Sequence, residues 1–312
     1  MKILVTGGQG FVGSKLVPQL LAEGHNVISV DIGWFGDYLP DHRNLIKIQS
    51  DVRDLTQKSL GNVDSIIHLA AIANDPLSDL HPSLSWEIGC LGTNHLLNLC
   101  ILNEVKHFIY ASSGSVYGLN NEMQVTENSN LVPISLYNKV KMVTERLVLS
   151  YAKLMKVTLV RPATICGISP RMRLDLAVNA LTMSALEKKE IHVDGGSQTR
   201  PNVHIDDVCD AYKFFLEDLA PAGVYNLGFE NLTLKQLAEL VNSRIPSKII
   251  YNSNNDPRSY RLNSDKILSA GFKPKRTVVN AIEDIEEAYS KNLLKNLPNW
   301  HSTKFLARVL SL

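Results

Sequence analysis

Residues 2–13, KILVTGGQGFVG, determine how this chain begins to fold. The apolar run 2–6 is typical of a buried strand, and a G-x-x-G-x-x-G pattern follows it directly. Residues without a Cβ let backbone N–H groups approach a pyrophosphate, and the N-terminus of the next helix faces that anion with partial positive charge. The pattern therefore predicts a dinucleotide-binding turn, with a turn used only for tight packing as the alternative. The residues assigned to it are Gly7, Gly10, Phe11, Val12 and Gly13.

Strand and helix patterns alternate through the first half of the chain. Short β-branched runs are separated by longer segments whose apolar residues recur at helical spacing. This alternation predicts an α/β fold, a Rossmann-type doubly wound parallel sheet with helices on both faces. Beyond residue 161 the pattern loosens, and we expect a smaller C-terminal lobe folded against the sheet. The expected strands are 2–6, 27–30, 45–48, 65–69, 108–112, 157–160, 191–193, 224–227 and 249–251, and the expected helices are 11–21, 84–102, 135–154, 174–186, 206–216, 234–243 and 278–289.

Asp31 ends the second predicted strand, 18 residues after Gly13. A carboxylate at this position can accept hydrogen bonds from both hydroxyls of an adenosine ribose, and it repels a 2′-phosphate. We therefore expect NAD to be bound in preference to NADP. The alternative is an acidic surface residue that merely ends the strand.

Tyr137 and Lys141 lie four residues apart, so on the predicted helix 135–154 they share a face. An adjacent ammonium favours the phenolate, and we expect it to move the pKa of Tyr137 toward neutrality. The tyrosine could then act as general base toward an alcohol or as general acid toward a ketone. Ser113 follows the strand 108–112, where its hydroxyl could hold the reacting oxygen. The alternative is a core tyrosine next to a surface lysine.

Composition excludes several classes of protein. The 312 residues are 45% hydrophobic and 20% charged, which is ordinary for a globular protein and excludes a disordered chain. The 32 basic and 31 acidic residues give a net charge of +1, which does not favour nucleic acid as a partner. The sequence has no apolar run long enough for a membrane span and no secretion signal, so we expect a cytoplasmic location and reduced cysteines. The histidines lack metal-ligand spacing, and we expect no metal.

The chain resembles the extended short-chain dehydrogenases/reductases of the NAD-dependent epimerase/dehydratase family. The resemblance runs from residue 2 to about residue 289, and it rests on motifs that occur in the family's order. These are TGGQGFVG (6–13), Asp31, Asp51-Val52, HLAA (68–71), Asn94, SSGSVYG (112–118), YNKVK (137–141), RPATICG (161–167), RPNVHIDDV (200–208) and DPRSY (256–260).

The resemblance implies a cofactor site for NAD in residues 1–165, with later segments returning to that domain. Asp51 and Val52 would flank the adenine, and residues 69–71 would line the middle of the cofactor. Lys141 would also bond the nicotinamide ribose, and the segment 161–167 would cover the nicotinamide. The cofactor residues implied beyond the glycine-rich turn are Asp31, Asp51, Val52, Leu69, Ala70, Ala71, Asn94, Tyr137, Lys141 and Pro162.

The resemblance also implies a nucleotide-diphosphate sugar as substrate, bound mainly by residues 166–290. Arginine suits the diphosphate because its planar fork meets phosphate oxygens in pairs. The stretch 169–175, SPRMRLD, further resembles bacterial capsule and O-antigen sugar-modifying enzymes. For each arginine the alternative is a surface salt bridge. The implied substrate residues are Ser113, Arg171, Arg173, Asn179, Arg200 and Arg258.

For the activity we expect a nucleotide-sugar epimerase that oxidises and re-reduces the sugar at C4 through a 4-keto intermediate. A one-way 4-dehydrogenase or 4-ketoreductase has identical motif chemistry and stays open. A 4,6-dehydratase is disfavoured, because Ser113-Gly114-Ser115 stands where that group carries Thr-Asp-Glu. A non-catalytic nucleotide-binding regulator is disfavoured by the intact Tyr137, Lys141 and Ser113.

We expect a homodimer. The resemblance implies pairing through the helices 84–102 and 135–154, and the first is apolar over most of its circumference. The alternative is that the tail 291–312, which lies beyond the resemblance, covers this surface.

Overall fold

A seven-stranded parallel sheet forms the larger part of the computed structural model, which describes residues 1–119, 122–253 and 259–310. The strand order is β10-β6-β5-β4-β1-β2-β3, and every neighbouring pair is parallel. The chain reverses its direction of winding at β1, with β2 on one side and β4 on the other. This confirms the doubly wound α/β prediction. The strands are β1 (Lys2–Thr6), β2 (Asn26–Asp31), β3 (Leu45–Gln49), β4 (Ser65–His68), β5 (His107–Ala111), β6 (Lys156–Pro162) and β10 (Gly223–Leu227).

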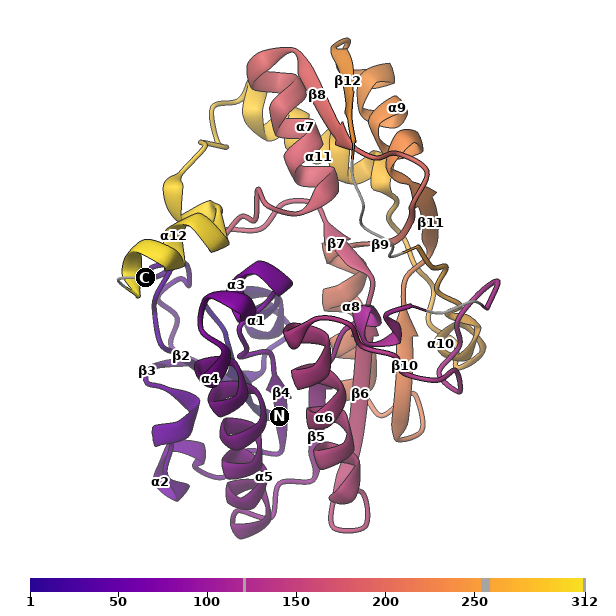
Figure 1. The fold of residues 1–312 in the computed structure, drawn as a ribbon. Helices are drawn as coiled ribbons and strands as arrows, with labels where there is room; N and C mark the ends of the chain where they lie inside the picture. Colours follow the sequence, from indigo (N-terminus) through magenta and orange to yellow (C-terminus); the bar gives the residue numbers. More distant parts are fainter. Residues whose placement is uncertain (120–121, 254–258, 311–312) are drawn as a thin grey trace.

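Helices cover both faces of this sheet (Figure 1). Alternate residues of β1 enter different cores: Ile3 and Val5 pack with α1 and α8, whereas Leu4 packs with α5 and α6. This alternation follows from the two-residue period of a strand. The covering helices are α1 (Gly13–Ala22), α2 (Gln57–Leu60), α3 (Asp75–Leu80), α4 (Pro82–Trp86), α5 (Thr93–Leu102), α6 (Leu136–Ser150) and α8 (Ile205–Leu216).

The predicted helix 84–102 is not one regular helix. A π-helical segment, Glu87–Gly92, separates α4 from α5. Its two glycines allow close packing, since a Cβ on Gly89 would lie 2.3 Å from Val140 Cγ1 and a Cβ on Gly92 would lie 2.8 Å from Val52 Cγ1. The predicted helix 135–154 begins as expected, with the Ser135 side chain accepting a hydrogen bond from Asn138 N, but it ends at Ser150.

A smaller lobe with its own apolar core lies above the sheet in Figure 1. A capping box formed by Thr233 and Gln236 begins α9 (Leu234–Arg244). Three short strands that the sequence did not predict join this lobe to the sheet domain: β7 (Thr164–Cys166), β9 (Thr199–His204) and β11 (Glu230–Thr233). The remaining elements are α7 (Ala177–Lys188), β8 (Glu190–Asp194), α9 (Leu234–Arg244), β12 (Lys248–Asn252), α10 (Asp265–Ser269), α11 (Val278–Ser290), the 3₁₀ turns Val52–Asp54, Gly114–Tyr117 and Pro298–Trp300, and α12 (Ser302–Val309).

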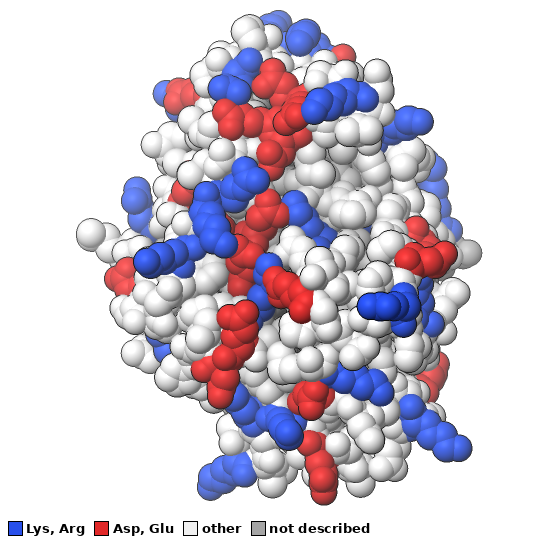
Figure 2. All heavy atoms as spheres, turned by 180° about the vertical axis from the view of Figure 1, so that it is seen from behind, with Lys and Arg blue, Asp and Glu red and all other residues white. Residues whose placement is uncertain are grey.

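The molecular surface carries charges of both signs. On the face seen from behind, Lys and Arg side chains lie next to Asp and Glu side chains (Figure 2). Within the described ranges, no helix combines the length and apolar character needed to cross a membrane. All four cysteines are free, and three of them are buried.

Candidate active site

One cavity of about 460 Å³ opens at the carboxyl ends of the parallel strands, next to the neighbours β1 and β4, between which the direction of winding reverses. Ligands of open α/β sheets bind at such a switch point. The cavity collects most of the predicted site residues, although they come from segments far apart in sequence. These are Gly7, Gly10, Phe11, Val12, Gly13, Asp31, Asp51, Val52, Leu69, Ala70, Ala71, Ser113, Tyr137, Lys141, Pro162, Arg171, Arg173 and Arg200.

The glycine-rich turn has no room for side chains. Gly7 has a φ of +73°, and a Cβ there would lie 2.8 Å from Ala70 N. A Cβ on Gly13 would lie 2.2 Å from Gly7 O. Both contacts are with protein backbone and explain why these positions hold glycine. Gly7, Gly10 and Gly13 also line the cavity, and their contact with a pyrophosphate stays a prediction.

Asp31 lies at the end of β2 on the cavity wall, with both carboxylate oxygens held by backbone. Oδ1 accepts from Gly33 N at 2.8 Å, and Oδ2 accepts from Gln9 N at 3.0 Å. Burial raises the pKa of Asp31, while these hydrogen bonds and the charge of Arg171 oppose the rise. The carboxylate is thus fixed in orientation at the end of the cavity that the sequence assigns to the adenosine ribose.

His68, at the end of β4, supports the neighbouring wall of the cavity. Its Nδ1 lies 2.6 Å from Thr6 Oγ1, and its Nε2 lies 2.9 Å from Thr93 Oγ1. Thr6 Oγ1 also accepts from Ala70 N at 3.3 Å. Burial lowers the pKa of His68 to about 3, so the ring is neutral and holds the segment 69–71 in place.

Tyr137 and Lys141 project from the first turns of α6 into the cavity, as predicted. Tyr137 and Ser113 both line the cavity, and the Ser113 side chain lies close enough to influence the pKa of Tyr137. The buried Lys141 donates from Nζ to Ala111 O at 2.6 Å, and this nitrogen lies 6.0 Å from the centre of the Tyr137 ring. Phenol, ammonium and serine hydroxyl therefore meet where β5 ends.

The expectation for the pKa of Tyr137 is wrong in this arrangement. Burial raises that pKa to about 12, and the influences that oppose the rise are the Ser113 side chain and the charge of Arg173. Lys141 does not lower it here because its ammonium points at Ala111 O. Burial also lowers the pKa of Lys141 to about 8.

The tripeptide Ser113-Gly114-Ser115 brings hydroxyl groups and no carboxyl group to the cavity. Ser113 Oγ lies 2.8 Å from Ser115 Oγ, and Ser115 Oγ donates to Asn138 Oδ1 at 2.6 Å. This tripeptide can orient an oxygen of a substrate, but it offers no acid or base for removing water across C5 and C6.

A buried ion pair beneath the cavity was not predicted. Arg161 donates from Nε and Nη2 to the two carboxylate oxygens of Glu145, at 2.8 and 2.6 Å. Ser112 Oγ donates to Glu145 Oε1 at 2.5 Å, and Arg161 Nη1 donates to Tyr117 OH at 2.7 Å. The pair fastens α6 to β5 and β6. The only hint in the sequence is that Glu145 lies four residues after Lys141, on the same helix face.

Two predicted residues, Asn94 and Asn179, do not line the cavity, and a third was predicted at a position that the structure does not describe. Asn94 accepts a hydrogen bond from Tyr151 OH on the outer side of α5. Asn179 is buried in α7, where its amide group donates to Gly167 O and Arg173 O. Arg258 lies outside the described residues. The ligand contacts expected of these three residues stay predictions.

The two arginines of SPRMRLD take different places. Arg173 is paired with Asp175, with Nη2 to Oδ2 at 2.9 Å, and its charge influences Tyr137. Arg171 lies toward the opposite end, where its charge influences Asp31. The cavity wall also includes Phe35, Ser302 and Leu306, which the sequence did not indicate as site residues.

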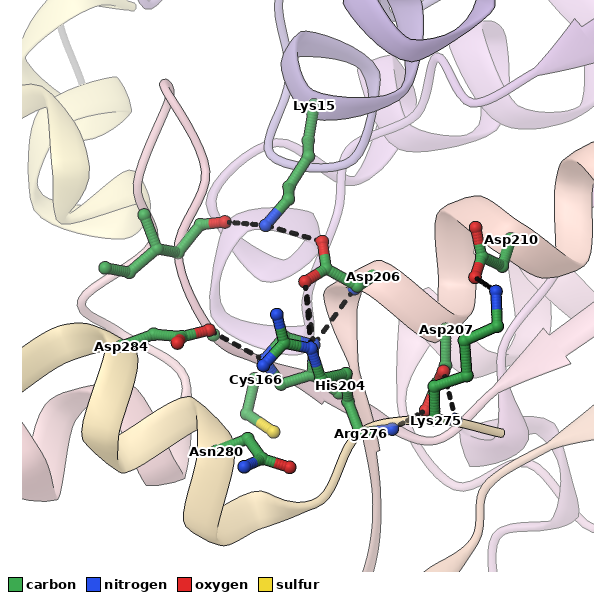
Figure 3. Close-up of polar contacts among 12 residues, drawn as sticks. Lys15, Cys166, His204, Asp206, Asp207, Asp210, Lys275, Arg276, Asn280 and Asp284 are labelled. Atoms are coloured by element: carbon green, nitrogen blue, oxygen red, sulfur yellow. Dashed lines mark hydrogen bonds and ion pairs between the residues drawn. The ribbon is translucent and has the colours of Figure 1, made fainter. Parts of the chain in front are cut away.

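A second polar cluster lies between α1, α8 and α11 (Figure 3). His204 Nδ1 accepts from Asp206 N at 3.1 Å, so in the neutral ring the proton is on Nε2, 3.4 Å from Asp284 Oδ2. Asp206 is also paired with Lys15 at 2.6 Å. A metal would need the Nε2 lone pair and free carboxylates, so we interpret this cluster as a structural junction.

The chain is similar to known proteins in both sequence and structure. The sequence model of the NAD dependent epimerase/dehydratase family matches residues 3–228. UDP-glucuronic acid decarboxylase 4 of Arabidopsis thaliana is 31% identical, covering 88% of this chain and 65% of the relative.

Two solved structures are similar over 94% of this chain and all of their own length. UDP-glucose 4-epimerase of Thermotoga maritima, solved with UDP-glucose, is 29% identical with a TM-score of 0.85. MoeE5, solved with UDP-glucuronic acid and NAD, is 26% identical with a TM-score of 0.84.

Proposed function

The chain belongs to the NAD-dependent epimerase/dehydratase family of nucleotide-sugar modifying enzymes, and we propose that it inverts a nucleotide sugar at C4. The supporting observation is the meeting of Tyr137, Ser113 and Lys141 in the cavity that also holds the glycine-rich turn and Asp31. We assign cofactor binding mainly to residues 1–165 and sugar binding mainly to residues 166–290.

NAD is the cofactor of this family, and the residues present fit it. Three glycines of the turn line the cavity at the start of α1, where backbone N–H groups can meet a pyrophosphate, and Asp31 offers a fixed carboxylate for the ribose hydroxyls. When bound, NAD supplies an acceptor for the hydride of C4 and returns that hydride to the sugar.

Tyr137 acts as the acid/base group in the proposed reaction. It takes the proton of the C4 hydroxyl as the alcohol becomes a ketone, and gives it back when the ketone is reduced. Ser113 holds the same oxygen, since its side chain already lies close to Tyr137. Arg173 places positive charge near this end of the cavity, where it favours the phenolate.

We propose a UDP-sugar as the first substrate class to test. The support is that the Thermotoga epimerase binds UDP-glucose and MoeE5 binds UDP-glucuronic acid. Arg200 faces the same cavity and offers a guanidinium to the diphosphate.

The test is conversion of paired 4-epimers by the purified protein without added NAD. UDP-glucose, UDP-galactose and the corresponding acids and N-acetylhexosamines would be supplied singly and separated by chromatography. Epimerisation predicts the same mixture from either member of a pair, with no build-up of reduced cofactor. Stoichiometric NADH with a 4-keto product would instead support the dehydrogenase. Loss of carbon dioxide from a glucuronic acid would contradict simple epimerisation.

A further inference from the structure

We propose that the C-terminal segment 298–309 is part of the cofactor site, where it closes the adenosine end of the cavity and retains NAD between turnovers. The placement of the segment stands on the structure alone, whereas the use of retained NAD within each turnover rests on the proposed epimerase function. The segment consists of the 3₁₀ turn Pro298–Trp300 and α12 (Ser302–Val309).

The chain leaves the smaller lobe after α11 and returns to the sheet domain, where α12 packs against α3 (Figure 1). Two loops fasten it there. Asn299 Nδ2 donates to Phe35 O and to Tyr38 OH, both at 2.7 Å, in the loop after β2. Leu174 N, in the loop before α7, donates to Trp300 O at 2.9 Å. The tail therefore bridges two loops that border the cavity.

Two residues of α12 form part of the cavity wall. Ser302 and Leu306 both line it, and Leu306 is 2% exposed. Leu306 belongs to the same apolar cluster as Val30, which precedes Asp31, and Val52, which the resemblance assigns to the adenine. On the outer side, the Phe305 ring lies 5.8 Å from the Phe35 ring, centre to centre. The helix thus presents an apolar side chain to the place where an adenine is expected.

Arg171 connects this tail to the interior of the cavity. Its guanidinium lies 3.8 Å from the centre of the Phe35 ring, and Nη2 donates to Ser302 Oγ at 2.8 Å. The residue is 2% exposed, and its Nε has no hydrogen-bond partner among the described residues. A buried cation is stable only when an anion or strong acceptors complete its surroundings. A phosphate of the cofactor would satisfy it next to the glycine-rich turn.

In this proposal the ligand held by the segment 298–309 is the dinucleotide. The dinucleotide would lie between the glycine-rich turn on one side and Arg171, Ser302 and Leu306 on the other. Release of NAD would then require the segment 298–309 to detach from both loops, and this detachment would slow exchange. Arg171, which the sequence placed with the substrate, belongs to the cofactor in this proposal.

The test measures cofactor release and needs no sugar substrate. The protein would be loaded with NADH, mixed with excess NAD, and followed by the decay of bound-NADH fluorescence. We expect a chain that ends at residue 297, and the variant Leu306→Asp, to release NADH at least ten times faster than the wild type. Lys304→Ala, on the exposed side of α12, is the matched control and should release at the wild-type rate.

Arg171→Met gives a second, independent reading, since it removes the charge and keeps much of the side-chain volume. It should also speed release, and added salt should alter its rate less than that of the wild type. Limited proteolysis with trypsin keeps the proposal testable if the variants fold poorly, because it uses the wild type alone. Saturating NAD should slow cleavage of the wild type at Lys304 and Arg308. Wild-type release from the folded truncation, or no protection by NAD, would overturn the proposal. Neither result depends on whether the enzyme epimerises a sugar.

Discussion

Tyr137 illustrates how burial and neighbouring groups compete at one residue. Burial raises its pKa to about 12, which disfavours the base that the proposed chemistry needs, and Ser113 and Arg173 act in the opposite direction. We expect Tyr137→Phe to lower turnover about 10²- to 10⁴-fold, the usual contribution of one acid/base group. NADH binding, measured by fluorescence, should be nearly unchanged. Turnover close to the wild type would contradict the proposed mechanism.

Asp31 should decide between the two nicotinamide cofactors. Its carboxylate is held by Gly33 N and Gln9 N, so it cannot turn away from a 2′-phosphate. We expect Asp31→Ala to weaken NAD binding and to narrow the preference for NAD over NADP, both measured as dissociation constants. Asp41→Ala, at an exposed position in the same part of the chain, is the control. If the wild type binds NADP as tightly as NAD, our interpretation of Asp31 is wrong.

Site residues were predictable where chemistry depends on sequence spacing. The glycine-rich turn and the Tyr137–Lys141 pair are local patterns, and the sequence placed them correctly. Phe35, Ser302 and Leu306 reach the cavity only through long-range packing, which leaves no local pattern. The pKa of Tyr137 was predicted wrongly because it depends on burial and on Arg173, and neither can be obtained from helical spacing.

The central strands carry two buried histidines that make the stability of the fold depend on pH. Burial lowers the pKa of His68, on β4, to about 3 and that of His107, on β5, to about 4, against an ordinary value of 6.5. Below pH 6.5 the unfolded chain therefore binds more protons than the folded chain, and the free energy of unfolding falls as pH falls toward 4. Each histidine contributes at most about 1.4 kcal/mol per pH unit.

Urea titrations between pH 7 and 4.5 would measure this slope. His107→Gln keeps a hydrogen-bonding side chain next to Thr158. It should reduce the slope of the free energy of unfolding against pH by up to about 1.4 kcal/mol per pH unit, the contribution of one proton. His42→Gln, at an exposed position, should leave it unchanged. Equal slopes in the wild type and His107→Gln would contradict the assignment.

The ion pair between α6 and β6 should be the costliest polar contact to break. Arg161→Met leaves the Glu145 carboxylate buried without its partner, and we expect a loss of about 3–5 kcal/mol in the free energy of unfolding. The double variant Glu145→Leu/Arg161→Met should recover part of that loss. Arg244→Met breaks the exposed pair with Glu283 and should cost about 0–1 kcal/mol. A small effect of Arg161→Met would contradict the role we give to this pair.

Strands and helices with a clear apolar pattern were predicted well. Strands in which that pattern is very short or interrupted were not. Most strands of the parallel sheet are short apolar runs, and the predicted positions of all seven agree with the structure within a few residues. The strands β7 and β11 were missed because they are very short, and β9 was missed because Arg200, Pro201 and Asn202 interrupt its apolar run. The π-helical segment was missed because it lies where Gly89 closely approaches Val140, and the sequence pattern does not reveal such a tertiary contact.

At the scale of the whole molecule, the tail and the proposed dimer surface turn out to be separate. The sequence left open whether residues 291–312 cover the helices 84–102 and 135–154. The structure places α12 against α3 and the cavity instead. Apolar side chains consequently stay exposed on the π-helical segment, α5, α6 and the turn that follows α6: Leu91, Leu102, Val143 and Leu154 are 63%, 63%, 40% and 66% exposed.

Pairing with a second copy of the chain would cover these side chains, because in a twofold dimer the same surface meets itself. Light scattering at micromolar concentration should then give about twice the chain mass of 34.7 kDa. The double variant Leu91→Arg/Val143→Arg should give a folded monomer, since it places like charges opposite one another. Leu219→Arg, at an exposed position beyond α8, should remain dimeric. A wild-type mass near that of one chain would refute the dimer, and the exposed leucines would then need another partner.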